Sequence, residues 1–153
     1  MVLRISDIEI STICHATEDI EKVKTALMKF IPQELRTNAR VEHLQAKGYY
    51  KNPITRLVVR FRGKEAEKVA KYIFSLIDSS ERTILLTTLD NRFDTRASKL
   101  YIRFSKQDAY LGSAVLFDGD DVIRVVMTLR RTKNFEDARK VLKELMEAEE
   151  RVK

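Results

Sequence analysis

One segment alternates between apolar and basic side chains and limits the folds open to the whole chain. Residues 54–62 read as an extended strand in which every second side chain is on the same face. One face of this strand carries Leu57, Val59 and Phe61. The opposite face carries Arg56, Val58, Arg60 and Arg62. Because one face is apolar and the other charged, the strand predicts a sheet that packs helices on a single face.

This strand is part of a longer basic run. Between Glu42 and Glu65 the chain has no acidic residue, but it has Lys47, Lys51, Arg56, Arg60, Arg62 and Lys64. Tyr49 and Tyr50 lie among them. Residues on one strand face repeat every 6 to 7 Å or so, roughly the spacing of phosphates along a nucleic acid. The run indicates a polyanionic partner, and we expect RNA. Alternatively, the arginine stems cover apolar surface while their charges pair with acids of a neighbouring helix.

Composition narrows the class of protein. The 153 residues are 44% hydrophobic, which is enough for one domain over residues 1–153. The single cysteine, Cys14, excludes an intramolecular disulfide. No signal peptide, lipidation motif or bilayer-length apolar run occurs, so we expect a cytoplasmic protein without membrane contact. A charged content of 34% with no tryptophan is typical of thermophile proteins.

Periodicity predicts an α+β fold, with a two-layer arrangement in which an antiparallel or mixed sheet packs helices on one face. We expect strands at residues 4–14, 40–46, 54–62, 99–104, 114–117 and 122–129. Helices are expected after Thr17, after Gly63, after Ser79 or Ser80, within residues 105–112 and after Asn134. A strand at residues 85–89 is an alternative to the end of the third helix.

A second segment combines basic, aromatic and amide side chains. In the strand that begins at Lys99, Tyr101 and Arg103 share one face, and Lys106 and Gln107 follow the strand end. Arginine and tyrosine on a sheet surface can bind a phosphate and stack on a base, while Gln107 can read a base edge. Alternatively, the charges pair locally with Asp94 or Asp108, and Tyr110 is half-buried.

Catalytic and metal sites have weaker support. Cys14, His15 and His43 are fewer than the four ligands of structural zinc, and they lack paired ligand spacing. Five aspartates could hold magnesium for phosphodiester cleavage, although turn chemistry explains them more simply: Asp90, Asp94, Asp118, Asp120 and Asp121. No glycine-rich phosphate loop occurs, so we expect no cofactor.

Residues 48–54 (GYYKNPI) and 100–112 (LYIRFSKQDAYLG) resemble an archaeal family of RNA-binding proteins, also described as predicted exosome subunits. The resemblance implies a fold similar to that of the ribosomal protein that binds the small ribosomal RNA of the large subunit. The family usually has histidine and glycine where this chain has Tyr49 or Tyr50 and Lys51, whereas Asn52, Pro53 and Ile54 agree.

The resulting hypothesis is a non-catalytic RNA-binding protein of RNA processing or ribosome-related assembly. The expected RNA-binding residues are Lys47, Tyr49, Tyr50, Lys51, Asn52, Arg56, Arg60, Arg62, Tyr101, Arg103, Lys106 and Gln107. The main alternative is a protein-interaction subunit of an RNA-processing complex with weak RNA affinity. A metal-dependent nuclease that uses the aspartates is the third class.

Overall fold

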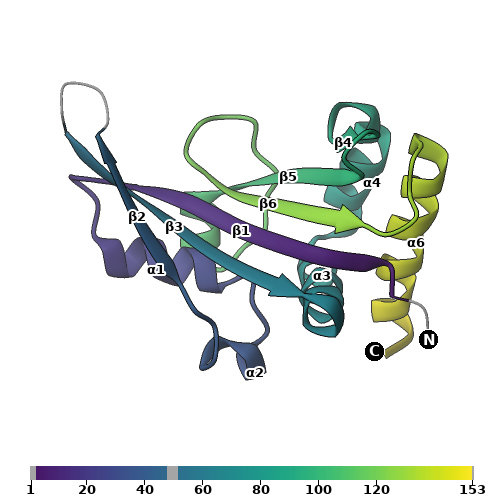
Figure 1. The fold of residues 1–153 in the computed structure, drawn as a ribbon, viewed down its shortest axis with the longest axis horizontal. Helices are drawn as coiled ribbons and strands as arrows, with labels where there is room; N and C mark the ends of the chain where they lie inside the picture. Colours follow the sequence, from purple (N-terminus) through teal and green to yellow (C-terminus); the bar gives the residue numbers. More distant parts are fainter. Residues whose placement is uncertain (1–2, 48–51, 153) are drawn as a thin grey trace.

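Six strands form one open antiparallel sheet in the order β2-β3-β1-β6-β5-β4 (Figure 1). The computed structural model describes residues 3–47 and 52–152. The strands are β1 (Ile5–His15), β2 (Glu42–Lys47), β3 (Pro53–Arg62), β4 (Phe93–Asp94), β5 (Lys99–Ser105) and β6 (Val122–Leu129). The helices are α1 (Ile20–Met28), α2 (Gln33–Arg36), α3 (Gly63–Leu76), α4 (Ser79–Thr87), the 3₁₀ turn η2 (Leu89–Asn91), α5 (Lys106–Tyr110) and α6 (Phe135–Val152).

The register of the central strands gathers the apolar side chains on one face. Ile10 of β1 is opposite Val59 of β3 and Val125 of β6. The same alternation of faces continues into β5, where Ile102 is opposite Val125. A shift of register next to Ile5 allows that isoleucine to be buried as well. Four adjacent strands therefore present one continuous apolar face.

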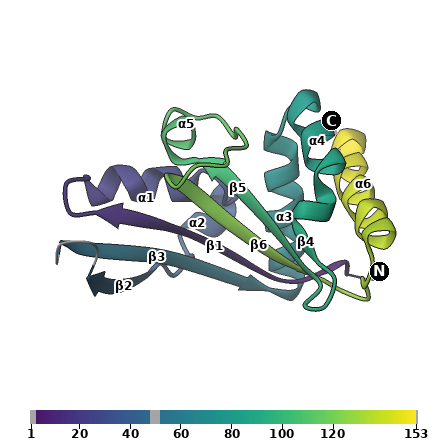
Figure 2. The ribbon, with the colours of Figure 1, turned by 90° about the horizontal axis from the view of Figure 1, so that it is seen from above.

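In the described part of the chain, the helices cover this apolar face, and the other face of the sheet has no helical layer (Figure 2). Phe30, just beyond α1, stacks on Phe104 of β5 with ring centroids 4.7 Å apart. Both rings are fully buried. The predicted α+β fold, with helices packed on one face of the sheet, is confirmed. No helix in the described ranges is long and apolar enough to cross a bilayer.

Residues 79–87 form a helix, so the strand alternative at residues 85–89 is wrong. The expected strand at residues 114–117 is also wrong, because only Leu116 bridges to Phe104 of β5. Asp19 caps α1 where Thr17 was expected. Asp78 similarly replaces the expected serine cap of α4. Asn134 caps α6 as predicted, since its Oδ1 accepts from the Asp137 amide at 2.7 Å.

Candidate nucleic-acid interface

The uncovered face of the sheet carries the charged side chains of β1, β3, β5 and β6. The predicted parity of β3 is correct: Leu57, Val59 and Phe61 are buried against the helices. Val58, on the uncovered face, is also fully buried. Arg56 and Arg60 flank Val58 on the same strand face, and long arginine stems can cover an apolar neighbour in this way.

The three arginines of β3 face acidic side chains of the adjacent strands, not of a helix. Glu9 of β1 pairs with Arg56 at 2.9 Å and with Arg60 at 3.1 Å. Arg60 also pairs with Glu42 of β2 at 2.8 Å, and these hydrogen bonds raise the pKa of the Arg60 guanidinium. Arg62 lies 3.6 Å from Asp7. Much of the positive charge on β3 is therefore compensated across the strands.

Arg103 and Arg124 have a different environment on β5 and β6. The two residues are direct cross-strand neighbours, an arrangement that is destabilising for like charges. No carboxylate among the described residues forms an ion pair with either guanidinium. Arg103 donates to the backbone carbonyls of Gly119 at 2.6 Å and Asp118 at 3.4 Å. These bonds fix the guanidinium without neutralising it.

Tyr101 completes this part of the surface. It lies on the same face of β5 as Arg103, and its cross-strand partner is Val126. The guanidinium of Arg124 stands over the Tyr101 ring, with the Arg124 Cζ 5.2 Å from the ring centroid. Two uncompensated cations and a half-buried ring thus lie together on the sheet surface, the combination that binds phosphates and stacks on bases.

These side chains border a hollow of about 670 Å³ on the uncovered face. Arg56 and His15 line it from the side of β3 and β1, and Asp120 from the loop before β6. Hereafter the sheet hollow means this depression, lined by Ser11, Thr12, Ile13, His15, Arg56, Tyr101, Arg103, Lys106, Asp120, Val122 and Arg124. Basic side chains outnumber the single acidic one, so the hollow suits an anionic ligand.

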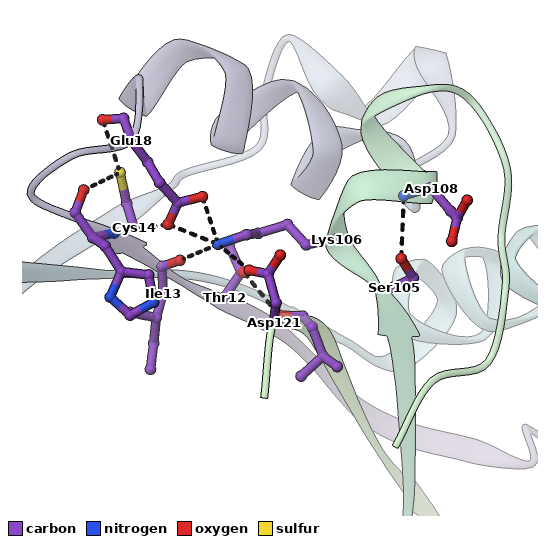
Figure 3. Close-up of polar contacts among 10 residues, drawn as sticks. Thr12, Ile13, Cys14, Glu18, Ser105, Lys106, Asp108 and Asp121 are labelled. Atoms are coloured by element: carbon purple, nitrogen blue, oxygen red, sulfur yellow. Dashed lines mark hydrogen bonds and ion pairs between the residues drawn. The ribbon is translucent and has the colours of Figure 1, made fainter. Parts of the chain in front are cut away.

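Lys106 is a buried lysine at one end of the sheet, where its side chain forms ion pairs (Figure 3). Only 6% of its side chain is exposed, and the Nζ pairs with Glu18 at 2.9 Å and Asp121 at 2.8 Å. The same Nζ donates to the backbone carbonyl of Ile13 at 2.8 Å. The lysine therefore joins the end of β1 to the starts of α1 and β6. All three of its donors have protein acceptors, which points to a structural role.

Cys14 lies beside this ion cluster (Figure 3). Its thiol is buried on the helix-covered face and approaches the backbone carbonyl of Glu18 at 3.8 Å. Burial, and then the negative charge of Glu18, raise the pKa of the Cys14 thiol. A protonated, enclosed thiol is a poor nucleophile and a poor metal ligand.

The described residues contain no group of three or more histidine, cysteine, aspartate or glutamate side chains that could hold a metal ion. Cys14 and His15 project to opposite faces of β1 because they are successive strand residues. Among the aspartates, Asp121 is paired with Lys106 and Asp94 accepts from the backbone amide of Arg96. The described residues therefore form a charged surface but no arrangement of side chains that would bind a metal ion.

Comparison with known proteins gives the family of the chain. A family model described as RNA binding matches residues 7–129, which include β2 to β6 and all of β1 but its first two residues. The chain belongs to this RNA-binding family. An uncharacterized protein of Methanocaldococcus jannaschii is 39% identical over 127 residues, covering 82% of this chain and 85% of the relative. The RNA-binding protein PAB1135 of Pyrococcus abyssi is 36% identical over 127 residues, covering 80% of each.

A solved structure supports the same assignment. The crystal structure of a protein from Archaeoglobus fulgidus is 33% identical, with a TM-score of 0.78. The match covers 93% of this chain and 99% of the other. The archaeal RNA-binding family expected from residues 48–54 and 100–112 is therefore confirmed.

The structure brings together only part of the predicted RNA-binding set. Tyr101, Arg103 and Arg56 border the sheet hollow, while Arg60 and Arg62 lie further along β3. Asn52 and Gln107 are exposed, and Lys106 is buried. The expected contacts of Tyr49, Tyr50, Lys51 and the Lys47 side chain lie outside the described residues.

Sequence reasoning missed Arg124 and His15 as members of the surface. Both belong to strands, and the alternation of each strand assigns the side chain to the polar face. That parity was a usable signal, but it does not show that Arg124 lies opposite Arg103. The acids Asp7 and Glu9 were also missed, although they alternate with isoleucines in the same manner.

Proposed function

We propose that this protein binds RNA on the uncovered face of its sheet and that it does so without catalysing a reaction. The observation that carries the proposal is the cross-strand pair of Arg103 and Arg124, which has no carboxylate partner among the described residues. Family membership and the name of the Pyrococcus relative favour RNA over other polyanions.

The arrangement suggests how the contacts divide. An RNA phosphate between Arg103 and Arg124 would relieve their mutual repulsion and accept charge-assisted hydrogen bonds from both. A neighbouring unpaired base would find Tyr101 within the same hollow, where stacking contributes roughly 1–3 kcal/mol. The phosphate contacts give affinity for any RNA, and the stacking favours unpaired segments.

The arginines of β3 have a secondary part in this proposal. A phosphate that approaches Arg60 must compete with Glu9 and Glu42, because both carboxylates already bind its guanidinium. Arg56 borders the sheet hollow and shares only Glu9. We therefore expect Arg56 to contribute more than Arg60 or Arg62. Contacts of Lys47, Tyr49, Tyr50, Lys51 and Asn52 with RNA remain predictions from the sequence.

A cellular role is part of the same proposal. We infer a cytoplasmic protein that acts in RNA processing or in ribosome-related assembly, where a sheet surface that tolerates many sequences is useful. Phosphate contacts without base-edge readers on the strands would give affinity with little sequence preference.

A filter-binding titration with an RNA stem-loop tests the site. The double variant Arg103→Gln/Arg124→Gln is compared with Arg139→Gln/Lys143→Gln, which removes the same charge from exposed positions of α6. We expect the first variant to bind about tenfold or more weakly, since a charge-assisted contact contributes roughly 1.5–3 kcal/mol. The α6 control should retain nearly the wild-type affinity. Equal losses in both variants would reject a localised site.

A protein-interaction subunit is the second candidate. It is favoured by two exposed apolar side chains near the compensated arginines, Ile13 at 40% and Leu44 at 45% exposure. In that case the surface would dock another protein of the complex, and the isolated chain would bind RNA weakly. Unchanged, weak RNA binding in both charge variants would favour this candidate.

A further inference from the structure

A second hollow lies at the same end of the sheet but on the helix side, where α5 packs against α1. Its volume is about 220 Å³. We call it the corner hollow, lined by Glu18, Lys22, Val23, Ala26, Lys106, Gln107, Tyr110 and Leu111. Lys106 lines both the corner hollow and the sheet hollow, so the two depressions adjoin this one buried side chain.

The walls of the corner hollow combine apolar and polar groups. Val23 and Ala26 of α1 are buried and form an apolar lining. Tyr110 is 44% exposed and Leu111 is 78% exposed, although both are large side chains next to the hollow. Gln107 is exposed at its border. An aromatic ring and an aliphatic side chain beside a primary amide can stack on a planar group and also bond to its edge.

Positive charge surrounds this corner. The Nζ of Lys22 lies 6.0 Å from the centre of the Tyr110 ring. Tyr110 also borders a neighbouring depression with Lys24, Lys29 and Arg36. None of the lysines Lys22, Lys24 and Lys29 forms an ion pair with a carboxylate among the described residues. Glu21 is the acid in that depression, while Glu18 is already paired with Lys106.

The size and charge of the corner select the class of ligand. Pockets for drug-sized molecules and cofactors usually measure about 300–1,000 Å³, so this hollow suits a smaller planar group. The surrounding lysines favour a ligand that carries negative charge next to its planar part. An unpaired nucleotide has both parts, with a base that can stack and a phosphate that can meet a lysine.

We propose that the corner hollow binds one unpaired base of an RNA that also contacts the uncovered sheet face. The base stacks on Tyr110 and Leu111, its edge meets the Gln107 amide, and its phosphate lies near Lys22. This inference rests on the proposed RNA binding and adds a site for which Arg103 and Arg124 are not required.

The test compares two RNAs with equal numbers of phosphates, one a stem-loop and the other a continuous duplex. Affinity is measured by fluorescence anisotropy for the wild type, Tyr110→Ala, Gln107→Ala and the control Ile84→Ala. Ile84 is also 44% exposed, but it lies in α4, at the opposite end of the molecule from α1 (Figures 1 and 2). Circular dichroism confirms that each variant is folded.

We expect Tyr110→Ala to weaken binding of the stem-loop by about 5- to 150-fold, the equivalent of one stacked base. Gln107→Ala should weaken it less, and both variants should bind the duplex as the wild type does. Ile84→Ala should match the wild type on both RNAs. The loop nucleotides are then replaced by abasic ones, one position at a time. At a single position, the wild type and Tyr110→Ala should bind the abasic RNA with equal affinity.

Unchanged affinity of Tyr110→Ala and Gln107→Ala for the stem-loop would overturn the inference. It would favour a protein partner as the ligand of the exposed Tyr110 and Leu111. An equal loss of affinity for the stem-loop and for the duplex would also overturn it. A duplex has no unpaired base, so losing a contact with an unpaired base cannot weaken its binding. In either case, binding that still depends on Arg103 and Arg124 would leave the proposed function intact. Failure of the wild type to bind either RNA would reject both proposals.

Discussion

At the scale of single residues, the surroundings of an arginine decide its function more than its position in a basic run does. Arg60 lies in the most basic part of the sequence, yet it is held between two carboxylates. Arg124 has acidic residues close by in the sequence, at positions 120 and 121, yet no carboxylate among the described residues pairs with it. A positive charge is available for an anionic ligand where the folded sheet brings no carboxylate to it.

The parity of β3 gives the first prediction. Phe61→Ala should lower the free energy of unfolding by about 3–5 kcal/mol, because the ring is buried in the hydrophobic core and its removal leaves a cavity. Urea denaturation of the purified variant measures this loss. Arg60→Ala, on the opposite face of the same strand, should unfold close to the wild-type midpoint. A larger loss for the arginine than for the phenylalanine would contradict the register.

The buried lysine gives the second prediction. Lys106→Met should lower the free energy of unfolding by about 3 kcal/mol, because it leaves the Glu18 and Asp121 carboxylates without their cation. The matched control is Lys140→Met on α6, whose i,i+4 pair with Glu136 contributes only about 0.3–0.5 kcal/mol. Equal losses in urea denaturation would show that the Lys106 cluster is not a structural support.

At the scale of strands and helices, alternation and helical period allowed most elements to be predicted. Residues 122–129 were predicted as a strand with the bounds that β6 has. Residues 114–117 were predicted wrongly because a short apolar run does not distinguish a strand from an edge loop. The segment makes only two backbone hydrogen bonds to β5, from the Phe117 amide and to the Val115 carbonyl.

The order of strands could not be predicted, and it decides the electrostatics of the surface. Tyr101 and Arg103 could be assigned to one face from the alternation of their own strand, without knowledge of the adjacent strands. The compensation of Arg56 by Glu9 and the pairing of Arg103 with Arg124 depend on which strands are adjacent. These contacts join residues that are far apart in sequence, so alternation along one strand carries no information about them.

The cross-strand pair gives the third prediction, which concerns strands β5 and β6. Arg124→Gln should change the free energy of unfolding by less than about 1 kcal/mol, because the like-charge repulsion that it removes offsets the loss of the cation–π contact with Tyr101. The same variant should bind RNA more weakly. Thermal or urea denaturation together with an RNA titration measures both effects. A clear loss of stability would mean that Arg124 supports the sheet and is not kept there for an anionic ligand.

At the scale of the whole molecule, a sheet with helices on one face leaves a broad surface on which RNA can lie. We predict that RNA incubated with the protein and magnesium or manganese yields no cleavage products. Asp118→Asn should leave RNA affinity nearly unchanged, because the Asp118 contact with Arg103 is made by its backbone carbonyl. Metal-dependent cleavage that is abolished by Asp118→Asn would instead favour a nuclease.

The salt dependence of RNA binding tests the central claim most directly, because it reports how many phosphates the protein neutralises. We predict that the logarithm of the association constant of wild-type protein for single-stranded RNA falls with the logarithm of salt concentration, with a slope of about −2 to −3.5. This corresponds to about three to five phosphates. In Arg103→Gln/Arg124→Gln the slope should become shallower by about 0.7, because the contact with one phosphate is lost, whereas Arg139→Gln/Lys143→Gln should keep the wild-type slope. A slope near zero for the wild type, or the same slope for both double variants, would contradict RNA binding by the uncovered sheet face.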